Sequence, residues 1–206
     1  MSTQAKAKYL LLFGIINFTL YFVIEAIIVT SEYDFLLPFD LVIPLIPEFI
    51  WIYHSFFAVI IISFLGLMKS RKLFFTCLSG FFIAMGILSL FYVIVPSYYP
   101  RDLWPVSMGS LSDWLLIKTR EIDAPNNTLP SGHNTFSWML VFFMAKTTCA
   151  KRFNWLIPAY FIWAILITAS TLFLKQHYIV DTISGVVLAY ICYRFSMRVI
   201  YPRIRE

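Results

Sequence analysis

The sequence predicts an all-α fold, a bundle of six transmembrane helices that forms one integral membrane domain over residues 1–206. Apolar residues make up 60% of the 206 residues and charged residues only 13%, against about half and about a quarter in ordinary soluble domains. A soluble domain of this size lacks the interior to bury so much apolar surface. The apolar residues also fall into six long runs, and none alternates as a β-barrel strand of about ten residues would.

Each run is long enough, or nearly so, to cross about 30 Å of hydrocarbon as a helix. The expected spans are residues 9–30, 49–68, 73–95, 133–149, 155–174 and 178–197. The first has a basic start but no small-residue cleavage site, so we expect a permanent span and not a signal peptide. The fourth is the weakest, because Lys146 and a pair of threonines interrupt its end.

The basic residues predict the orientation, because they are divided unequally between the two sides of the membrane. The termini and loops on one side of the expected spans carry twelve of them, and the loops on the other side carry four. The twelve are Lys6, Lys8, Lys69, Arg71, Lys72, Lys146, Lys151, Arg152, Arg194, Arg198, Arg203 and Arg205. The four are Arg101, Lys118, Arg120 and Lys175. The positive-inside rule then predicts cytoplasmic termini and an outer position for the longest loop, 96–132. Since these residues form no single patch, the net charge of +5 indicates membrane topology and no nucleic-acid partner.

His177 and Asp181 stand four residues apart where the last span begins. On a helix this spacing puts both side chains on one face. The carboxylate would accept a hydrogen bond from one imidazole nitrogen and leave the other free to act as a nucleophile. An acid that enters a membrane helix is costly and usually functional. The alternative interpretation is a hydrated helix cap.

The sequence Pro-Ser-Gly-His, residues 130–133, leads into the fourth span. Ser131 is a favoured helix N-cap, and the backbone N–H groups of a helix start form an anion site. Gly132 would let a phosphate approach the backbone closely. His133 would then lie beside the phosphate and give a proton to a leaving alkoxide. A capped helix with an interfacial histidine is the alternative for this motif alone.

Arg101 and Lys175 are the candidate cations for the non-bridging phosphate oxygens, because they flank the two histidine stretches on the outer side. Lys118 and Arg120 are interpreted as interfacial anchors of an amphipathic stretch, SLSDWLLIK.

Other reactive side chains carry less weight. His54 has no neighbouring acid or cation in the sequence and is interpreted as interfacial packing, while the role of Glu25 stays open. Cys77, Cys149 and Cys192 lack CxxC spacing and are odd in number, so neither disulfides nor a zinc site is expected. No carboxylates or histidines show metal-ligand spacing, and we expect metal-independent chemistry.

Together these motifs resemble the type 2 phosphatidic acid phosphatase superfamily over roughly residues 40–195. The central motif of that family, Pro-Ser-x-His, is matched in full at residues 130–133. The third motif is Ser-Arg, five residues, His, three residues, Asp. This chain matches it at Ser170, His177 and Asp181 but has Thr171 in place of the arginine.

The first motif of the family, Lys, six residues, Arg-Pro, keeps only its arginine as Arg101, with Ile94 and Asp102 at the other two positions. These departures resemble a divergent branch that includes inositol phosphorylceramide synthase-like proteins. In such a branch, Arg101 and Lys175 would do the phosphate binding of the missing Lys and Arg.

The resemblance implies a six-span bundle with a histidine nucleophile and no cofactor. We therefore expect a lipid phosphatase with an outward-facing, extracytoplasmic active site, which hydrolyses a lipid phosphate ester through a phosphohistidine intermediate. His177 would attack phosphorus, oriented by Asp181, and His133 would protonate the leaving group. The phosphate would be held by Arg101, Lys175, Ser131 and Gly132. The expected partners are a lipid phosphate substrate and the surrounding membrane lipids.

Two alternatives remain from the sequence. One is a phosphotransferase that passes the phosphoryl headgroup to another alcohol, as inositol phosphorylceramide or sphingomyelin synthases do. The other is a non-catalytic transporter, but its substrate site would lie near the bilayer midplane and not at one side. Catalysis further requires that the imidazoles of His133 and His177 lie within about 10 Å of each other, so that one phosphate can reach both.

Overall fold

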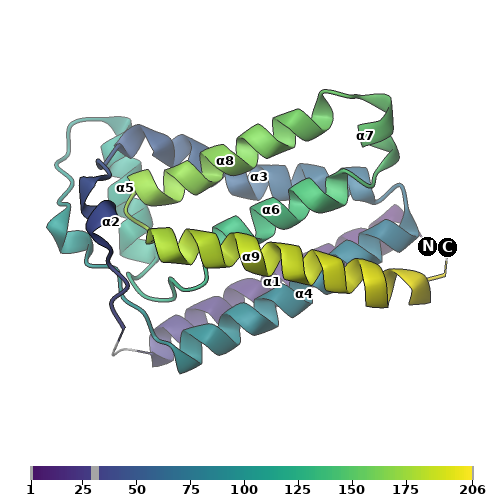
Figure 1. Ribbon diagram of the computed structural model, residues 1–206, viewed down its shortest axis with the longest axis horizontal. Helices are drawn as coiled ribbons and strands as arrows, with labels where there is room; N and C mark the ends of the chain where they lie inside the picture. The colour runs from purple at the N-terminus through teal and green to yellow at the C-terminus, as the bar shows by residue number, and fades with distance from the viewer. Residues whose placement is uncertain (1, 29–32, 206) are drawn as a thin grey trace.

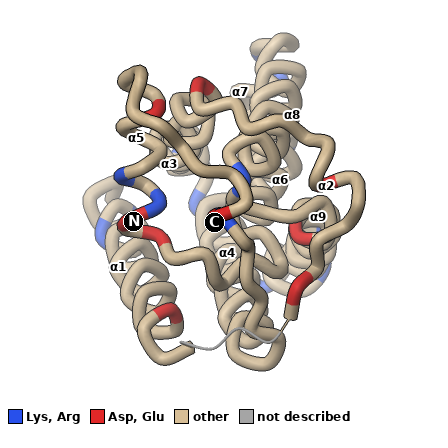
Figure 2. The backbone as a smooth tube through the Cα atoms, turned by 90° about the vertical axis from the view of Figure 1, so that its left-hand side faces the viewer, with Lys and Arg blue, Asp and Glu red and all other residues tan. Residues whose placement is uncertain are grey.

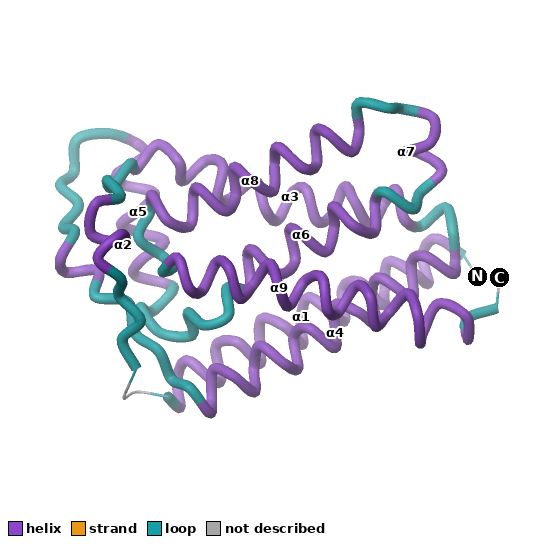
Figure 3. Tube along the Cα trace, viewed as in Figure 1, coloured by secondary structure: helices purple, strands orange, loops and turns teal. Residues whose placement is uncertain are grey.

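The computed structural model describes residues 2–28 and 33–205, and over these residues the chain forms helices and loops and no β-strand (Figure 1 and Figure 3). The predicted all-α class is therefore confirmed. The α-helices are α1 (Thr3–Ile27), α2 (Pro38–Val42), α3 (Ile50–Leu67), α4 (Arg71–Ile94), α5 (Leu111–Ile122), α6 (Gly132–Met144), α7 (Thr148–Arg152), α8 (Leu156–Phe173) and α9 (Ile179–Phe195). A π-helical turn, Ser196–Ile200, extends α9.

Among the described residues, five helical segments are long and apolar enough to cross a membrane, and they match five of the six predicted spans. They are Thr3–Ile27, Pro47–Leu67, Arg71–Ile94, Leu156–Phe173 and Ile179–Arg203. Residues 29 and 30, the predicted end of the first span, lie outside the described residues.

The predicted fourth span corresponds to α6, which starts as expected but ends at Met144 and not at residue 149. Its 13 residues measure about 20 Å at a rise of 1.5 Å per residue, less than the hydrocarbon thickness of about 30 Å. A count of six spans therefore stays a prediction.

The short helix α6 lies at the centre of the bundle, in contact with α3, α4, α8 and α9 (Figure 1). Nine of its 13 side chains are buried, so it is surrounded by protein and not by lipid. Polar residues are therefore tolerated along it. For example, the Thr168 hydroxyl donates to Asn134 Oδ1 at 2.5 Å, and Thr135 Oγ1 donates to the carbonyl of Ser131 at 2.8 Å.

Gly185 of α9 lets the start of α6 approach α9 closely. A Cβ atom at this position would lie 2.7 Å from the carbonyl oxygen of Ser131, and a backbone atom cannot move aside as a flexible side chain can. The backbone N–H of Ser131 also donates to the carbonyl of Asp181 at 3.0 Å. This crossing brings the Pro-Ser-Gly-His segment next to the helix that begins after His177.

Both termini lie at one end of the bundle, and most of the long loops gather at the other end together with α2 and α5 (Figure 1 and Figure 3). We call the second end the loop end; it comprises residues 33–49, 95–131 and 174–178. Acidic residues lie in the segments of this end (Figure 2), whereas the twelve basic residues counted above belong to the opposite end. This charge asymmetry agrees with the predicted cytoplasmic termini, whose sidedness stays a prediction.

Candidate active site

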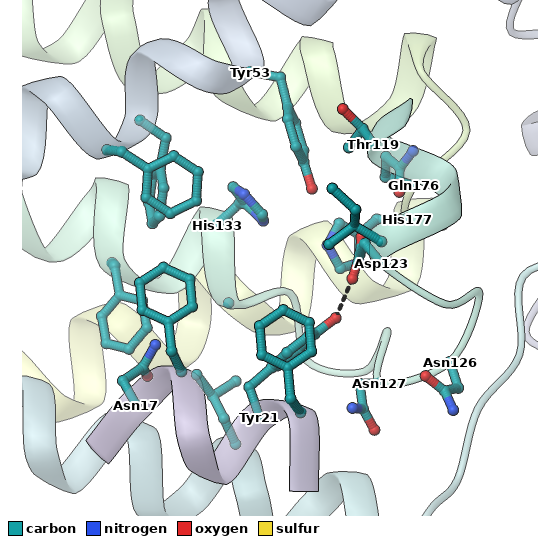
Figure 4. Close-up of a pocket in the computed structure, with 18 of the residues that line it drawn as sticks. Asn17, Tyr21, Tyr53, Thr119, Asp123, Asn126, Asn127, His133, Gln176 and His177 are labelled. Atoms are coloured by element: carbon teal, nitrogen blue, oxygen red, sulfur yellow. Dashed lines mark hydrogen bonds between the residues drawn. The ribbon is translucent and has the colours of Figure 1, made fainter. Parts of the chain in front are cut away.

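A cavity of about 350 Å³ lies at the loop end, between α1, α3, α4, α5 and the start of α6 (Figure 4). Both His133 and His177 line it. The centroids of the two imidazole rings are 6.2 Å apart. The predicted proximity of the two histidines is therefore confirmed.

His177 is held by its Nδ1 atom. This nitrogen lies 3.0 Å from the carbonyl oxygen of Thr128 and 3.4 Å from Oδ2 of Asp181. Both oxygens only accept hydrogen bonds, so Nδ1 carries the proton and Nε2 keeps its lone pair. The geometry thus leaves Nε2 without a hydrogen-bond partner among the described residues.

Asp181 does two things at the start of α9. Its Oδ2 atom accepts a hydrogen bond of 2.9 Å from the backbone N–H of Tyr178, which caps the helix, and the same atom lies 3.4 Å from Nδ1 of His177. The residue is fully buried, so it is not the hydrated cap of the alternative interpretation. A buried carboxylate beside an imidazole stabilises the imidazolium form.

His133 lies in the first turn of α6, against aromatic side chains of α3. Its ring stacks on Tyr53 with a centroid distance of 4.2 Å and contacts Phe56 at 4.6 Å. Its Nε2 atom is buried and has no hydrogen-bond partner among the described residues. The packing therefore fixes the ring and leaves one nitrogen for a ligand in the cavity.

Arg101 is placed by two loop segments that run side by side. The backbone N–H of Tyr99 donates to the carbonyl of Pro125 at 2.7 Å, and the hydroxyls of Ser97 and Thr128 are 2.6 Å apart. The same contacts therefore position Arg101 and the Thr128 carbonyl that holds His177. The Arg101 side chain is buried and lines the cavity.

The guanidinium of Arg101 contacts Asp123 and Gln176. It donates to the backbone carbonyl of Asp123, lies 3.4 Å from the Asp123 carboxylate, and donates to Gln176 Oε1 at 2.5 Å. Tyr21 of α1 donates to the other oxygen of Asp123 at 2.5 Å (Figure 4). This network ties α1 to the loop that carries the site.

Several buried N–H groups around the cavity have no acceptor among the described residues. They are Nε of Arg101, the side-chain amide of Asn127 and Nε2 of Gln176. An unpaired buried donor costs about 1–3 kcal/mol, and three of them around one cavity indicate a ligand that accepts hydrogen bonds. An anion with several oxygens, such as a phosphate, meets that description.

The model of the PAP2 superfamily matches residues 95–205, more than half of the chain. The chain belongs to the PAP2 superfamily. This superfamily comprises phosphatases and phosphotransferases, and its match includes Arg101, His133, His177 and Asp181 but neither α1 nor α3.

One curated relative, an uncharacterized protein of Methanocaldococcus jannaschii, is 39% identical over 71 residues. The aligned stretch is 34% of this chain and 27% of that protein, so the chain spans about a quarter of that relative. No solved structure matches the chain.

Lys175, predicted as a phosphate ligand of this PAP2 protein, does not line the cavity. Its ammonium group donates to the carbonyl of Asp40 at 2.8 Å and lies 4.2 Å from the centre of the Trp104 ring. The backbone at Lys175 is left-handed, with a φ of 57°, which turns the side chain toward α2. Burial lowers the pKa of Lys175, and Asp40 partly opposes the shift. We therefore withdraw Lys175 as a phosphate ligand.

The two other predicted phosphate-binding residues differ in their positions. Gly132 lines the cavity. Ser131 is fully buried and does not line the cavity; its hydroxyl caps α6 by accepting from the backbone N–H of Asn134 at 3.3 Å. Its role is therefore to fix the start of the helix that carries His133, and its predicted contact with phosphate is corrected.

The remaining outer cations stabilise the loop end. Arg120 donates to the carbonyls of Trp104 at 2.9 Å and Leu174 at 3.1 Å. Burial, with a smaller contribution from Arg101, lowers the pKa of Arg120 to about 10. Lys118 pairs with Glu121 at 2.7 Å on the exposed side of α5. Arg101 is thus the buried cation of the cavity.

His54 and Glu25 both have hydrogen-bond partners at the loop end. His54 Nε2 lies 2.9 Å from the Thr119 hydroxyl, and it lines the cavity, which the sequence did not indicate. Glu25 accepts from the backbone N–H of Ala124 at 2.8 Å. The contact of His54 joins α3 to α5, and the contact of Glu25 joins α1 to the segment directly after α5.

Asp123, Gln176 and Asn127 line the cavity, and sequence reasoning assigned none of them a role. Asn127 has a φ of 56°, a conformation that asparagine adopts more readily than most residues. One indication in the sequence that Asn127 belongs to the site was the pair Asn126-Asn127 shortly before the Pro-Ser-Gly-His segment. Gln176 gave none, because a neutral amide beside a histidine is common in loops.

Proposed function

We propose that this protein is an integral membrane lipid phosphatase that hydrolyses a lipid phosphate ester through a phosphohistidine intermediate on His177. The observation that carries the proposal is one cavity lined by His133, His177 and Arg101. Among the described residues, Nε2 of His133 and Nε of Arg101 have no hydrogen-bond partner, and His177 is held through Nδ1. Membership of the PAP2 superfamily supports the reaction class.

Arg101 would bind the non-bridging oxygens of the phosphate. Its guanidinium already lies between Asp123 and Gln176, so its orientation is fixed before a substrate arrives. Asn127 and Gln176 would add their unpaired amide N–H groups. Charge and hydrogen bonds on these oxygens stabilise the transition state of phosphoryl transfer.

The reaction would proceed in two steps. Nε2 of His177 forms a bond to phosphorus while the bond between phosphorus and the lipid oxygen breaks, and protonated His133 gives its proton to that oxygen. Asp181 stabilises the positive charge that develops on His177. A water molecule then attacks phosphorus, His133 takes its proton, and inorganic phosphate leaves as the P–N bond breaks.

The lipid nature of the substrate is supported by the surroundings of the cavity. Helix α5 forms one wall, and Leu111, Trp114 and Ile122 of this helix are exposed. Such a helix lies at the membrane interface with its apolar side toward lipid. A phosphate headgroup at the interface would then reach the histidines, on the extracytoplasmic side if the termini are cytoplasmic.

Purified protein in detergent should release inorganic phosphate from lipid phosphates with EDTA present. The described residues hold no group of three or more His, Cys, Asp or Glu side chains placed to bind one metal ion, and the proposed steps use only side chains. A phosphate assay over a panel of lipid phosphates measures this. Activity that EDTA removes and a divalent cation restores would contradict metal independence. Phosphorylated product that forms only with an added alcohol would indicate transfer in place of hydrolysis.

Arg101→Lys should lower kcat by about 10²–10³-fold, comparable with the loss of one donor from an oxyanion site. Lysine keeps the charge but cannot hold two phosphate oxygens with the planar fork of arginine. Steady-state kinetics on a lipid phosphate check this value. Lys118→Met is the matched control, because Lys118 is an exposed cation at the cavity rim that already pairs with Glu121. Equal losses in both variants would remove Arg101 from phosphate binding.

A further inference from the structure

A second cavity, of about 740 Å³, lies between α1 and α3. We call it the α1–α3 groove. It shares lining residues with the catalytic cavity, namely Asn17, Phe18, Phe56, Phe57 and Phe136. From this junction it extends toward the opposite end of the bundle, as far as Ala7 on α1 and Met68, the residue directly after α3. The groove is therefore continuous with the site around His133.

The dimensions and chemistry of the groove suit a hydrocarbon chain. Met68 stands 14 positions after His54, which lies at the catalytic cavity, and this separation corresponds to about 21 Å along the helix axis. One leaflet contributes about 15 Å of hydrocarbon, half of the usual bilayer core. The lining is apolar apart from Asn17 and Thr19, so a chain of membrane-lipid length meets no unpaired charge.

The groove is also accessible from the side. Phe18 of α1 and Phe57 of α3 stack across the junction with ring centroids 5.9 Å apart, and their exposed fractions are 46% and 40%. A lipid in the surrounding bilayer can therefore reach the junction without passing through the loop end. The ring of Phe57 lies 6.4 Å from that of His133, which places the start of the groove beside the proposed proton donor.

We propose that the α1–α3 groove binds the hydrocarbon chain of the substrate. The phosphate lies at His177, and the hydrocarbon chain runs toward the end of the bundle that holds both protein termini. This inference rests on the proposed function and names the part of the molecule that selects its substrates by chain length. Both helices lie outside the region that matches the family model.

Gly14 keeps the groove open. It lines the groove on α1, and a Cβ atom there would have no neighbour within 4 Å. Packing within the chain therefore does not require glycine here, and glycine within a helix costs about 0.5–1 kcal/mol relative to alanine. A larger side chain at this position would fill the groove without disturbing α1.

Gly14→Phe should restrict the enzyme to substrates with a shorter hydrocarbon chain. We expect the ratio of kcat/KM for hexadecyl phosphate to that for butyl phosphate to fall about tenfold, the lower range for one misfitting group in an apolar pocket. Gly86→Phe is the matched control. Gly86 lies on α4, is exposed, lines neither cavity and also has open space around its Cβ, and its ratio should not change.

An unchanged ratio in Gly14→Phe, or an equal fall in both variants, would overturn the proposal. Binding is measured separately with hexadecyl phosphate that carries a photoreactive group at the end of its hydrocarbon chain. The measurement uses the His177→Ala protein, because labelling requires binding but no turnover. Labelling should map to residues 7–15 and 60–68, and Gly14→Phe should reduce it. Labelling confined to α8 or α9 would contradict the groove. If the wild-type protein hydrolyses neither phosphate but the label maps as expected, the proposed reaction fails and the groove stands.

Discussion

His177→Ala should abolish turnover on every phosphate substrate, with a loss of roughly 10⁴-fold or more, as for removal of other nucleophiles. Without the imidazole no covalent intermediate forms, whatever the leaving group. The structure adds a specific expectation. Because the Thr128 carbonyl and Asp181 hold Nδ1, the phosphoryl group should be attached to Nε2.

Rapid base-quench of the wild-type protein with a ³²P-labelled lipid phosphate should trap a label on His177 that is stable in base and is lost in acid. The His177→Ala protein should carry none. His54→Ala is the matched control, because His54 lines the same cavity but bonds Thr119; it should still form the labelled intermediate. A label that persists in His177→Ala would assign the nucleophile to another residue.

The spans could be predicted from the sequence because length and hydropathy are local properties. The predicted run 73–95 and the helix Arg71–Ile94 differ by only one or two residues at each end. Helix α6 ends earlier than predicted because its limits depend on the protein around it. Its 13 residues pack in the centre of the bundle, where a helix need not match the thickness of the bilayer.

The histidine pair and Arg101 could also be predicted, since their motifs combine a helix start, a fixed spacing and a nearby cation. The direction of a loop side chain could not. Lys175 and Gln176 are neighbours, yet the lysine bonds the Asp40 carbonyl and the glutamine lines the cavity. A single left-handed residue decides between them, and lysine is not a residue type that favours such a conformation.

The α1–α3 groove was invisible in the sequence for a different reason. In a membrane protein the side chains that face lipid and those that line an apolar groove have the same chemistry. Leu11 and Leu65 line the groove, but nothing in their residue type separates them from Leu12, which lines neither cavity. Only the gap between the two helices shows the difference.

His133→Ala should have an effect that depends on the leaving group. If His133 gives its proton to the departing oxygen, an alkyl phosphate should lose about 10²–10⁴-fold, the usual range for general acid catalysis. A lipid-like substrate with a nitrophenolate leaving group should lose far less, because nitrophenolate departs readily as an anion. The Nε2 atom of His133 is buried and has no partner in the described part of the chain. Because its ring lies 6.2 Å from that of His177, His133 is within reach of such an oxygen.

Single-turnover rates of phosphoenzyme formation for the wild type, His133→Ala and His177→Ala on both substrates separate the two roles. His177→Ala should fail with either leaving group, whereas His133→Ala should fail mainly with the alkyl phosphate. His133→Phe is a useful companion variant, because it keeps the aromatic packing against Tyr53 and Phe56 but removes the nitrogen atoms. Equal losses on the two leaving groups would take His133 out of the acid role. Its unpaired nitrogen would then serve to hold the phosphate and not to move a proton.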